Sequence, residues 1–252
     1  MQRTFKTDQL TVQVYESSAA LGEAAAQFVA ETINRTIQDA GEARVIFATG
    51  NSQLQFLEAL LRHPVNWGHV TAFHLDEYLN LPETHPASFR RYLREKLFDK
   101  VVMKAVHLLN GEAPDAEAEA RRYADLLNAA PVHLACIGIG ENGHIAFNDP
   151  PADFNAPSPV HIVTLDDISR RQQVGEGHFP TFDDVPAQAL SLSVPGILNA
   201  QAIACIVPEA RKAEAVRRTL QEPVSPDIPA SILRQHPNTT LFLDPDSAGQ
   251  IP

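Results

Sequence analysis

Short apolar runs alternate with longer amphipathic segments along most of this chain, and this alternation restricts the folds it can adopt. Helical periodicity marks residues 17–39, 54–61, 88–98, 115–128 and 209–220. Strand-like runs lie at residues 10–15, 44–48, 69–75, 132–137, 160–165, 189–194, 202–207 and 239–243. Strands joined by helices of this length form right-handed βαβ units, with helices on both faces of a mostly parallel sheet. We therefore predict an α/β fold, an open, Rossmann-like three-layer αβα sandwich, as a single domain over residues 1–252.

The two ends of the chain carry weaker signals. Residues 10–15 alternate apolar and polar side chains, as a strand at the edge of a sheet does. Residues 244–252 are polar, and we expect this tail to fray.

The amino-acid composition limits the classes of partner that this protein can bind. The formal net charge is −11 and 44% of the residues are hydrophobic. This balance argues against nucleic acid and anionic membrane as partners, but it leaves room for a locally positive pocket. Cys136 and Cys205 lie in apolar runs, as free thiols in a reducing compartment do, so we expect a cytoplasmic protein. The N-terminus lacks the apolar segment of a signal peptide, and no apolar run approaches the ~18 residues of a membrane span.

A glycine-rich segment follows the apolar run at 132–137. It contains Gly138, Gly140 and Gly143, then His144, and Asp149 comes five residues later, before two prolines. Turns at the carboxyl ends of strands are where open α/β sheets bind ligands. A carboxylate near the imidazole can set its tautomer and tune its pKa. A lone histidine is usually structural, but this combination indicates an acid/base site.

A second turn, Thr49-Gly50-Asn51-Ser52, connects a strand-like run to a helical one. Its backbone N–H groups and hydroxyls, at the positive end of a helix, can bind an anion such as phosphate. The alternative is an ordinary turn in which Asn51 or Ser52 caps the helix.

Two adjacent carboxylates, Asp76 and Glu77, follow the strand-like run at 69–75. Neighbouring residues of a strand point to opposite faces, so only one of the two needs to face a cleft. A carboxylate whose pKa is raised by burial is a candidate general base. The alternative is that the pair caps the next element or lies in solvent.

Lys212 falls in the first turn of the helix predicted over 209–220. A cation gains nothing from the dipole at that end of a helix, so the position suits a lysine that binds an anionic ligand. By position alone, an ordinary solvated surface lysine remains the simpler alternative.

Taken together and in order, these segments resemble the glucosamine-6-phosphate deaminase (isomerase) family. The matching segments cover residues 48–52, 74–82, 85–89, 108–111, 140–150 and 212–213. The most diagnostic is Gly-Glu-Asn-Gly-His-Ile-Ala-Phe-Asn-Asp-Pro at 140–150.

The resemblance implies an aldose-to-ketose isomerisation, without cofactor or metal, coupled to loss of ammonia. The implied partner is a small-molecule sugar phosphate, such as glucosamine 6-phosphate, which becomes fructose 6-phosphate. By resemblance, Asp76 moves the proton from C2 to C1, and His144 assists ring opening, oriented by Asn142 and Asp149. The resemblance assigns binding of the substrate's phosphate group to Thr49, Gly50, Asn51, Ser52 and Lys212. Nothing in the sequence sets the number of subunits, and a homo-oligomer stays an open alternative.

Two positions near His144 depart from the family pattern. Position 142 is Asn where many members have Asp; an amide can orient the imidazole but cannot raise its pKa as an anion would. Asp149 replaces the usual Glu and is one methylene shorter, so its reach to the imidazole depends on the backbone. Glu141 is a substitute charge only if it points inward.

A third departure concerns a phosphate-binding arginine that the family carries shortly before a Phe and a Pro. Here the corresponding segment, residues 173–180, contains no arginine. Arg170 or Arg171 could compensate from one turn earlier, with His178 as a weaker candidate. The departure puts the exact sugar in doubt more than the reaction type.

Two other functions compete with this one. A 6-phosphogluconolactonase shares the fold, but that family carries Asp-Glu-Arg and Gly-His-Thr-Ala-Ser where this chain has Asp-Glu-Tyr at 76–78 and Gly-His-Ile-Ala-Phe at 143–147. A non-catalytic sugar-phosphate sensor would be expected to lose the base, and Asp76 is present. Both comparisons favour the deaminase.

Overall fold

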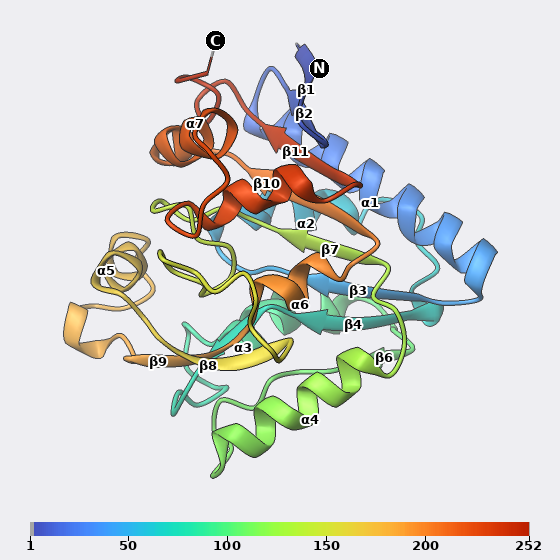
Figure 1. The fold of residues 1–252 in the computed structure, drawn as a ribbon. Coiled ribbons are helices and arrows are strands. Elements are labelled where there is room, and N and C mark those ends of the chain that lie inside the picture. The colour runs from blue at the N-terminus through green and yellow to red at the C-terminus, as the bar shows by residue number, and fades with distance from the viewer. Residues whose placement is uncertain (1–2, 252) are drawn as a thin grey trace.

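The computed structural model describes residues 3–251, and its centre is one large sheet (Figure 1). The strand order is β1 (Arg3–Thr7), β2 (Leu10–Val14), β11 (Thr239–Leu243), β10 (Ala202–Val207), β7 (Leu134–Ile137), β3 (Ala43–Phe47), β4 (Val70–His74) and β6 (Ala105–Val106). Only the pair β1–β2 is antiparallel within this sheet. The predicted α/β class with a mostly parallel sheet is confirmed.

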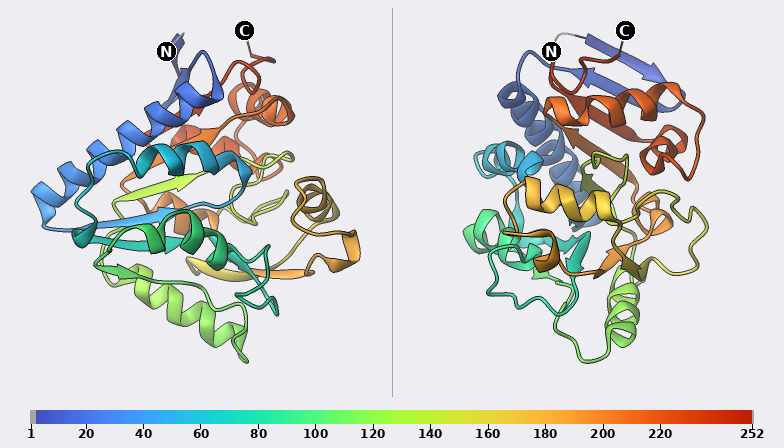
Figure 2. Two further views of the ribbon diagram at one scale, coloured as in Figure 1. Left: turned by 180° about the vertical axis from the view of Figure 1, so that it is seen from behind. Right: turned by 90° about the vertical axis from the view of Figure 1, so that its left-hand side faces the viewer.

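Helices cover both faces of this sheet, as the two further views show (Figure 2). One face carries α1 (Ser18–Ala40), α2 (Leu54–Leu60) and α3 (Phe89–Lys96), and the other carries α4 (Ala116–Asn128), α6 (Val194–Leu198) and α7 (Ala213–Gln221). Each face has its own buried apolar cluster: Phe47 and Cys136 belong to the first, Ile46 and Cys205 to the second. Neighbouring residues of one strand therefore pack into the apolar clusters on opposite faces of the sheet, because side chains alternate across a strand.

A serine side chain caps the start of α1. Ser17 Oγ accepts a hydrogen bond from Ala20 N at 3.1 Å, and the helix ends where Gly41 adopts a left-handed φ of 81°. Such side-chain caps satisfy backbone N–H groups that have no partner within the helix, and they therefore place its first residue.

A second, small antiparallel sheet contains β5 (Asp76–Tyr78), β9 (Gln188–Leu192) and β8 (Val160–Thr164), in that order. The strands predicted at 160–165 and 189–194 thus form, but they do not join the parallel sheet as expected. Helix α5 (Asp167–Gly175), which connects them through a further turn, was not predicted. Local periodicity identifies a strand but not its partner, because pairing depends on contacts distant in sequence.

The ends of the chain differ from expectation. β1 lies outside β2, so residues 10–15 do not form the edge strand. The tail through Ile251 is packed and not frayed: Ser247 is fully buried, and Asp244 Oδ1 accepts from Ser247 N at 2.8 Å. Asp244 also accepts from Glu209 N at 3.1 Å, a tertiary contact that the sequence pattern does not reveal. The predicted tail residue Pro252 lies outside the described residues.

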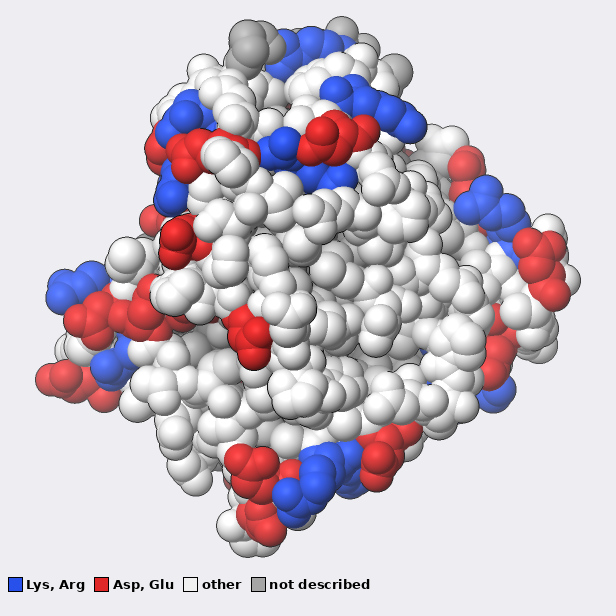
Figure 3. Space-filling view, in the orientation of Figure 1, with Lys and Arg blue, Asp and Glu red and all other residues white. Residues whose placement is uncertain are grey.

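The surface gives two further observations. On the face drawn in Figure 3, acidic and basic side chains are interspersed around the rim and most of the middle is uncharged, so that face has no continuous basic surface. No helix within residues 3–251 is both long enough and apolar enough to cross a membrane.

Candidate active site

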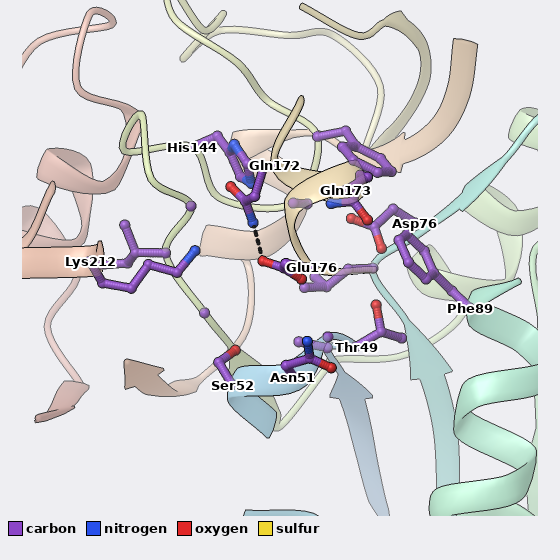
Figure 4. A pocket seen from close by; sticks show the side chains of 18 of the residues that line it. Thr49, Asn51, Ser52, Asp76, Phe89, His144, Gln172, Gln173, Glu176 and Lys212 are labelled. Atoms are coloured by element: carbon purple, nitrogen blue, oxygen red, sulfur yellow. Dashed lines mark hydrogen bonds between the residues drawn. The ribbon is translucent and has the colours of Figure 1, made fainter. Parts of the chain in front are cut away.

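A pocket opens at the carboxyl ends of β3, β4, β7 and β10 (Figure 4). From β3 the chain proceeds to β4 and β6 on one side, whereas β7, β10 and β11 lie on the other. The strand order therefore reverses between β3 and β7, and such switch points leave a crevice for ligands. Most of the predicted site residues line this pocket: Thr49, Gly50, Asn51, Ser52, Asp76, His144 and Lys212.

Asp76 lies where the chain leaves β4 and enters the small sheet, and its side chain points into the pocket (Figure 4). Burial, together with the adjacent charge of Glu77, raises the pKa of Asp76 to about 8. Glu77 points the other way, as predicted: it accepts from Ser88 Oγ at 2.8 Å and from Arg90 Nε at 3.0 Å. Only one of the two adjacent carboxylates is thus available to a ligand.

The glycines before His144 give its ring the space it needs. A Cβ on Gly140 would lie 2.2 Å from the His144 Cε1 atom, so no larger residue fits. Gly140 N also donates to the His144 carbonyl at 2.9 Å, and Gly143 has a φ of +91° that favours glycine. The segment folds into a tight turn that carries the imidazole to the pocket wall.

Behind the imidazole lies a hydrogen-bonded network. The Nδ1 atom of His144 is 3.2 Å from Asp149 Oδ1 and 3.1 Å from Ser169 Oγ, and Ser169 Oγ also donates to Asp149. Burial by itself would raise the pKa of Asp149. The hydrogen bond and charge of His144, with bonds from Ser169 and Asn142, outweigh burial and hold that pKa below its ordinary value. An ionised Asp149 can therefore fix the imidazole tautomer and stabilise its protonated form.

Asn142 and Asp149 do not line the pocket but support His144 from behind. Asp149 reaches the ring in spite of its shorter side chain. Asn142, which was expected to orient the imidazole directly, acts differently: its Nδ2 donates to Asp149 at 3.0 Å and its Oδ1 accepts from the His144 backbone N at 3.0 Å. The amide serves both bonds because it is donor and acceptor at once.

Sequence reasoning missed Ser169, which lies on α5. Its N–H donates to the Asp166 carboxylate at 2.6 Å, a helix cap that the sequence Asp-Asp-Ile-Ser at 166–169 does signal. The cap predicts the helix start but not that the Ser169 hydroxyl faces His144, because only the tertiary fold brings residues 25 positions apart together.

The opposite end of the pocket contains the predicted phosphate turn. Gly50 has a φ of +95°, and its carbonyl accepts from Tyr92 Oη at 2.8 Å, which fixes the turn before α2. Lys212 lies at the end of a 3₁₀ turn, Ala210–Lys212, so α7 begins four residues later than predicted. Its side chain is buried and not solvated, and among residues 3–251 no carboxylate lies within ion-pairing distance of its ammonium. Burial lowers the pKa of Lys212, with Glu176 opposing.

The arginines proposed to compensate for the missing family arginine do not line the pocket. Arg170 donates to the Phe182 and Val185 carbonyls, and both Arg170 and Arg171 lie over the Phe182 ring. His178 does not line the pocket, but its Nε2 atom lies 3.2 Å from Oε2 of Glu176, which does. The polar side chains of the pocket lining that sequence reasoning missed are Gln172, Gln173, Glu176 and Arg211.

Comparison with known proteins fits this geometry. The model of the family described as glucosamine-6-phosphate isomerases/6-phosphogluconolactonase matches residues 16–242. The chain belongs to this family. A glucosamine-6-phosphate deaminase of Bacillus cytotoxicus is 36% identical over 238 residues, which cover 94% of this chain and 88% of the relative. A relative of the same name from an Exiguobacterium species is 38% identical over 81% of the chain and 78% of the relative.

Solved structures agree on the fold. A monomeric glucosamine-6-phosphate deaminase superposes with a TM-score of 0.87 at 31% identity, covering 95% of this chain and 99% of that one. A 6-phosphogluconolactonase of Shewanella baltica gives a TM-score of 0.77 at 18% identity, with the same coverage, and this likeness concerns the fold alone. Within residues 3–251 no group of three His, Cys, Asp or Glu side chains is placed to hold a metal ion.

Proposed function

We propose that this protein is an enzyme that converts an amino-sugar 6-phosphate, such as glucosamine 6-phosphate, into the ketose 6-phosphate and ammonia. The observation that carries the proposal is the convergence of Asp76, His144 and Lys212 on one pocket. The family membership and the deaminase relatives at 36–38% identity support the same activity.

The first step is ring opening. His144 accepts the proton of the anomeric hydroxyl O1 and delivers a proton to the ring oxygen, so the C1–O5 bond breaks and an aldehyde forms at C1. Asp149, held ionised by its hydrogen bonds, stabilises the imidazolium between these two transfers. The histidine is neutral again when the open-chain sugar is in place.

Proton transfer between the two carbons follows. The Asp76 carboxylate removes the C2 proton, and the electron pair forms the C1–C2 double bond as the carbonyl oxygen takes up a proton from solvent. Asp76 then returns its proton to C1 while the nitrogen lone pair forms a C2 iminium. A pKa of about 8 suits both halves of this transfer, because the group must accept and then release a proton near neutral pH.

Loss of ammonia completes the reaction. Water adds to the C2 iminium carbon, the C–N bond breaks, and the ketose is left with its carbonyl at C2. The phosphate, bound by Lys212 and the turn Thr49-Gly50-Asn51-Ser52, does not react. Binding energy from this remote group holds C1 and C2 against Asp76, which raises the rate of the chemical step.

The decisive experiment measures ammonia release from glucosamine 6-phosphate and galactosamine 6-phosphate. We expect turnover of at least one of the two, and the ratio of their kcat/KM values identifies the preferred sugar. The control substrate is 6-phosphogluconolactone. Lactone hydrolysis without ammonia release from either amino sugar would refute the proposal in favour of the lactonase activity.

A further inference from the structure

A charged cluster lies beside Lys212 and has no part in the mechanism above. Arg211, its neighbour in sequence, contacts three carboxylates: its Nη1 atom is 2.8 Å from Glu176 Oε1 and 3.4 Å from Glu141 Oε1, and its Nε atom is 2.6 Å from Glu209 Oε2. Arg211 and Glu176 both line the pocket, whereas Glu141 and Glu209 do not.

Glu176 occupies space inside the pocket. Its side chain is 5% exposed and accepts from Gln172 Nε2 at 2.8 Å and from His178 Nε2 at 3.2 Å. In Figure 4 it projects toward the space between Lys212 and the turn that holds Asn51 and Ser52. Burial alone would raise the pKa of Glu176, but His178, Arg211 and Lys212 lower it to about 2, so the carboxylate is ionised.

The charges of this cluster do not suit a bound dianion. Lys212 and Arg211 supply two positive charges, and Glu141, Glu176 and Glu209 supply three negative ones, so the cluster is negative before any ligand arrives. A phosphate beside an ionised, buried carboxylate is repelled, because the surroundings screen like charges poorly there. The observed arrangement therefore fits the empty pocket better than the occupied one.

We propose that Glu176 is a built-in competitor for the phosphate group: the arriving sugar phosphate displaces its carboxylate, and Arg211 then binds the phosphate beside Lys212. This inference rests on the proposed function, because it takes a sugar phosphate as the ligand. Arg211 thereby supplies the second cation of the anion site, which neither Arg170 nor Arg171 provides.

The backbone around Glu176 allows such a displacement. The residue directly follows α5 and lies between Gly175 and Gly177. Gly177 has a φ of +80°, and a Cβ built on either glycine would meet no atom within 4 Å. The Glu176 backbone N–H donates to the Gln172 carbonyl at 2.8 Å, whereas its side chain is held by polar contacts and not by tight packing of its neighbours. Exchange of one anion for another at Arg211 removes the ion pair, and the hydrogen bonds from Gln172 and His178 break as the side chain moves.

The test measures dissociation constants by isothermal titration calorimetry. The probes are inorganic phosphate and glucitol 6-phosphate, a hexitol that has neither the amine nor the aldehyde and cannot react. Glu176→Gln keeps the shape and an acceptor for Arg211 but removes the charge, and we expect about tenfold tighter binding of both probes. Arg211→Gln should weaken binding of both about tenfold. If Arg211→Gln does not fold, Arg211→Lys replaces it, with a smaller expected loss.

Glu209→Gln is the matched control, because it removes a carboxylate from the same arginine but outside the pocket lining. We expect it to change binding less than twofold. Equal gains from Glu176→Gln and Glu209→Gln would mean that only the overall charge matters, and would overturn the displacement. Unchanged or weaker binding in Glu176→Gln, unchanged binding in Arg211→Gln, or no binding by the unaltered protein would overturn it as well.

These outcomes are separable from those of the proposed function. The calorimetric experiment needs no turnover, and the ammonia assay does not depend on how Glu176 moves. Ammonia release, with no tighter binding of the probes by Glu176→Gln, would support the proposed function and contradict the displacement of Glu176. The expected changes in probe binding by Glu176→Gln and Arg211→Gln, without ammonia release, would support the anion site and contradict the deaminase chemistry.

Discussion

The two ends of the pocket differ in how completely their charges are matched. At the His144 end, Asp149 receives hydrogen bonds from Asn142 and Ser169 as well as facing the imidazole, so the network is complete without substrate. At the Lys212 end, a buried ammonium has no carboxylate within ion-pairing distance in the described chain, while neighbouring Arg211 is shared among three carboxylates.

The difference follows from what each end is proposed to do. Proton transfer requires donors and acceptors that are fixed in place before the substrate arrives, because reorganisation during the reaction costs rate. An anion site instead gains its binding energy at the moment the ligand supplies the missing charge. The four predictions below test this contrast, from the largest expected effect to the smallest.

Asp76→Asn should have the largest effect. The amide cannot accept the C2 proton, so we expect kcat to fall by about 10³-fold or more, the upper part of the range for general acid–base groups. Binding of glucitol 6-phosphate, measured by calorimetry, should stay within a few fold. Turnover close to that of the unaltered enzyme would remove Asp76 from the base position.

Lys212→Ala should act on binding more than on chemistry. Loss of a charge-assisted hydrogen bond to phosphate, worth about 2–3 kcal/mol, corresponds to a rise in KM of roughly 30- to 150-fold. Steady-state kinetics with glucosamine 6-phosphate measure it, and Lys212→Met controls for the lost volume of the side chain. An unchanged KM in both variants would exclude Lys212 from the site.

Asp149→Asn tests whether the complete network matters for the reaction. The amide preserves the shape but loses the charge that orients and stabilises the imidazole, so we expect kcat to fall about 10- to 100-fold with little change in KM. Asp153→Asn, at an exposed position of the neighbouring loop, is the control and should leave kcat unchanged. A fall in both variants alike would point to a general effect of charge.

The smallest effect concerns stability. The pKa of Asp76 is about 8 when folded and about 3.9 when unfolded, so folding takes up a proton between these values and stability falls as the pH rises through this window. Asp76→Asn abolishes this loss. At pH 7.5 it should therefore be more stable than the unaltered protein, with a higher Tm.

Melting curves of both proteins at pH 4.5, 6 and 7.5 measure this effect. We expect the gap between the two melting temperatures to widen as the pH rises. A gap that stays constant, or that closes toward pH 7.5, contradicts the raised pKa of Asp76 in the folded state.

Much of this protein follows from sequence alone. The alternation of strand and helix periods predicts the α/β fold, because each element must bury an apolar face of its own period. Local chemistry also predicts that Asp76, His144 and the turn at 49–52 share one site, since each follows a buried strand and the carboxyl ends of parallel strands meet at one edge of the sheet.

Only the tertiary structure decided which other groups surround Asp76, His144 and the turn at 49–52. Ser169 reaches His144 from a helix that the sequence did not predict, β8 and β9 pair in a separate sheet, and Glu176 enters the pocket beside Arg211. The physical reason is the same in each case. Periodicity and capping are local properties of a chain, whereas burial, strand pairing and ion pairing depend on residues far apart in sequence that only the completed fold brings into contact.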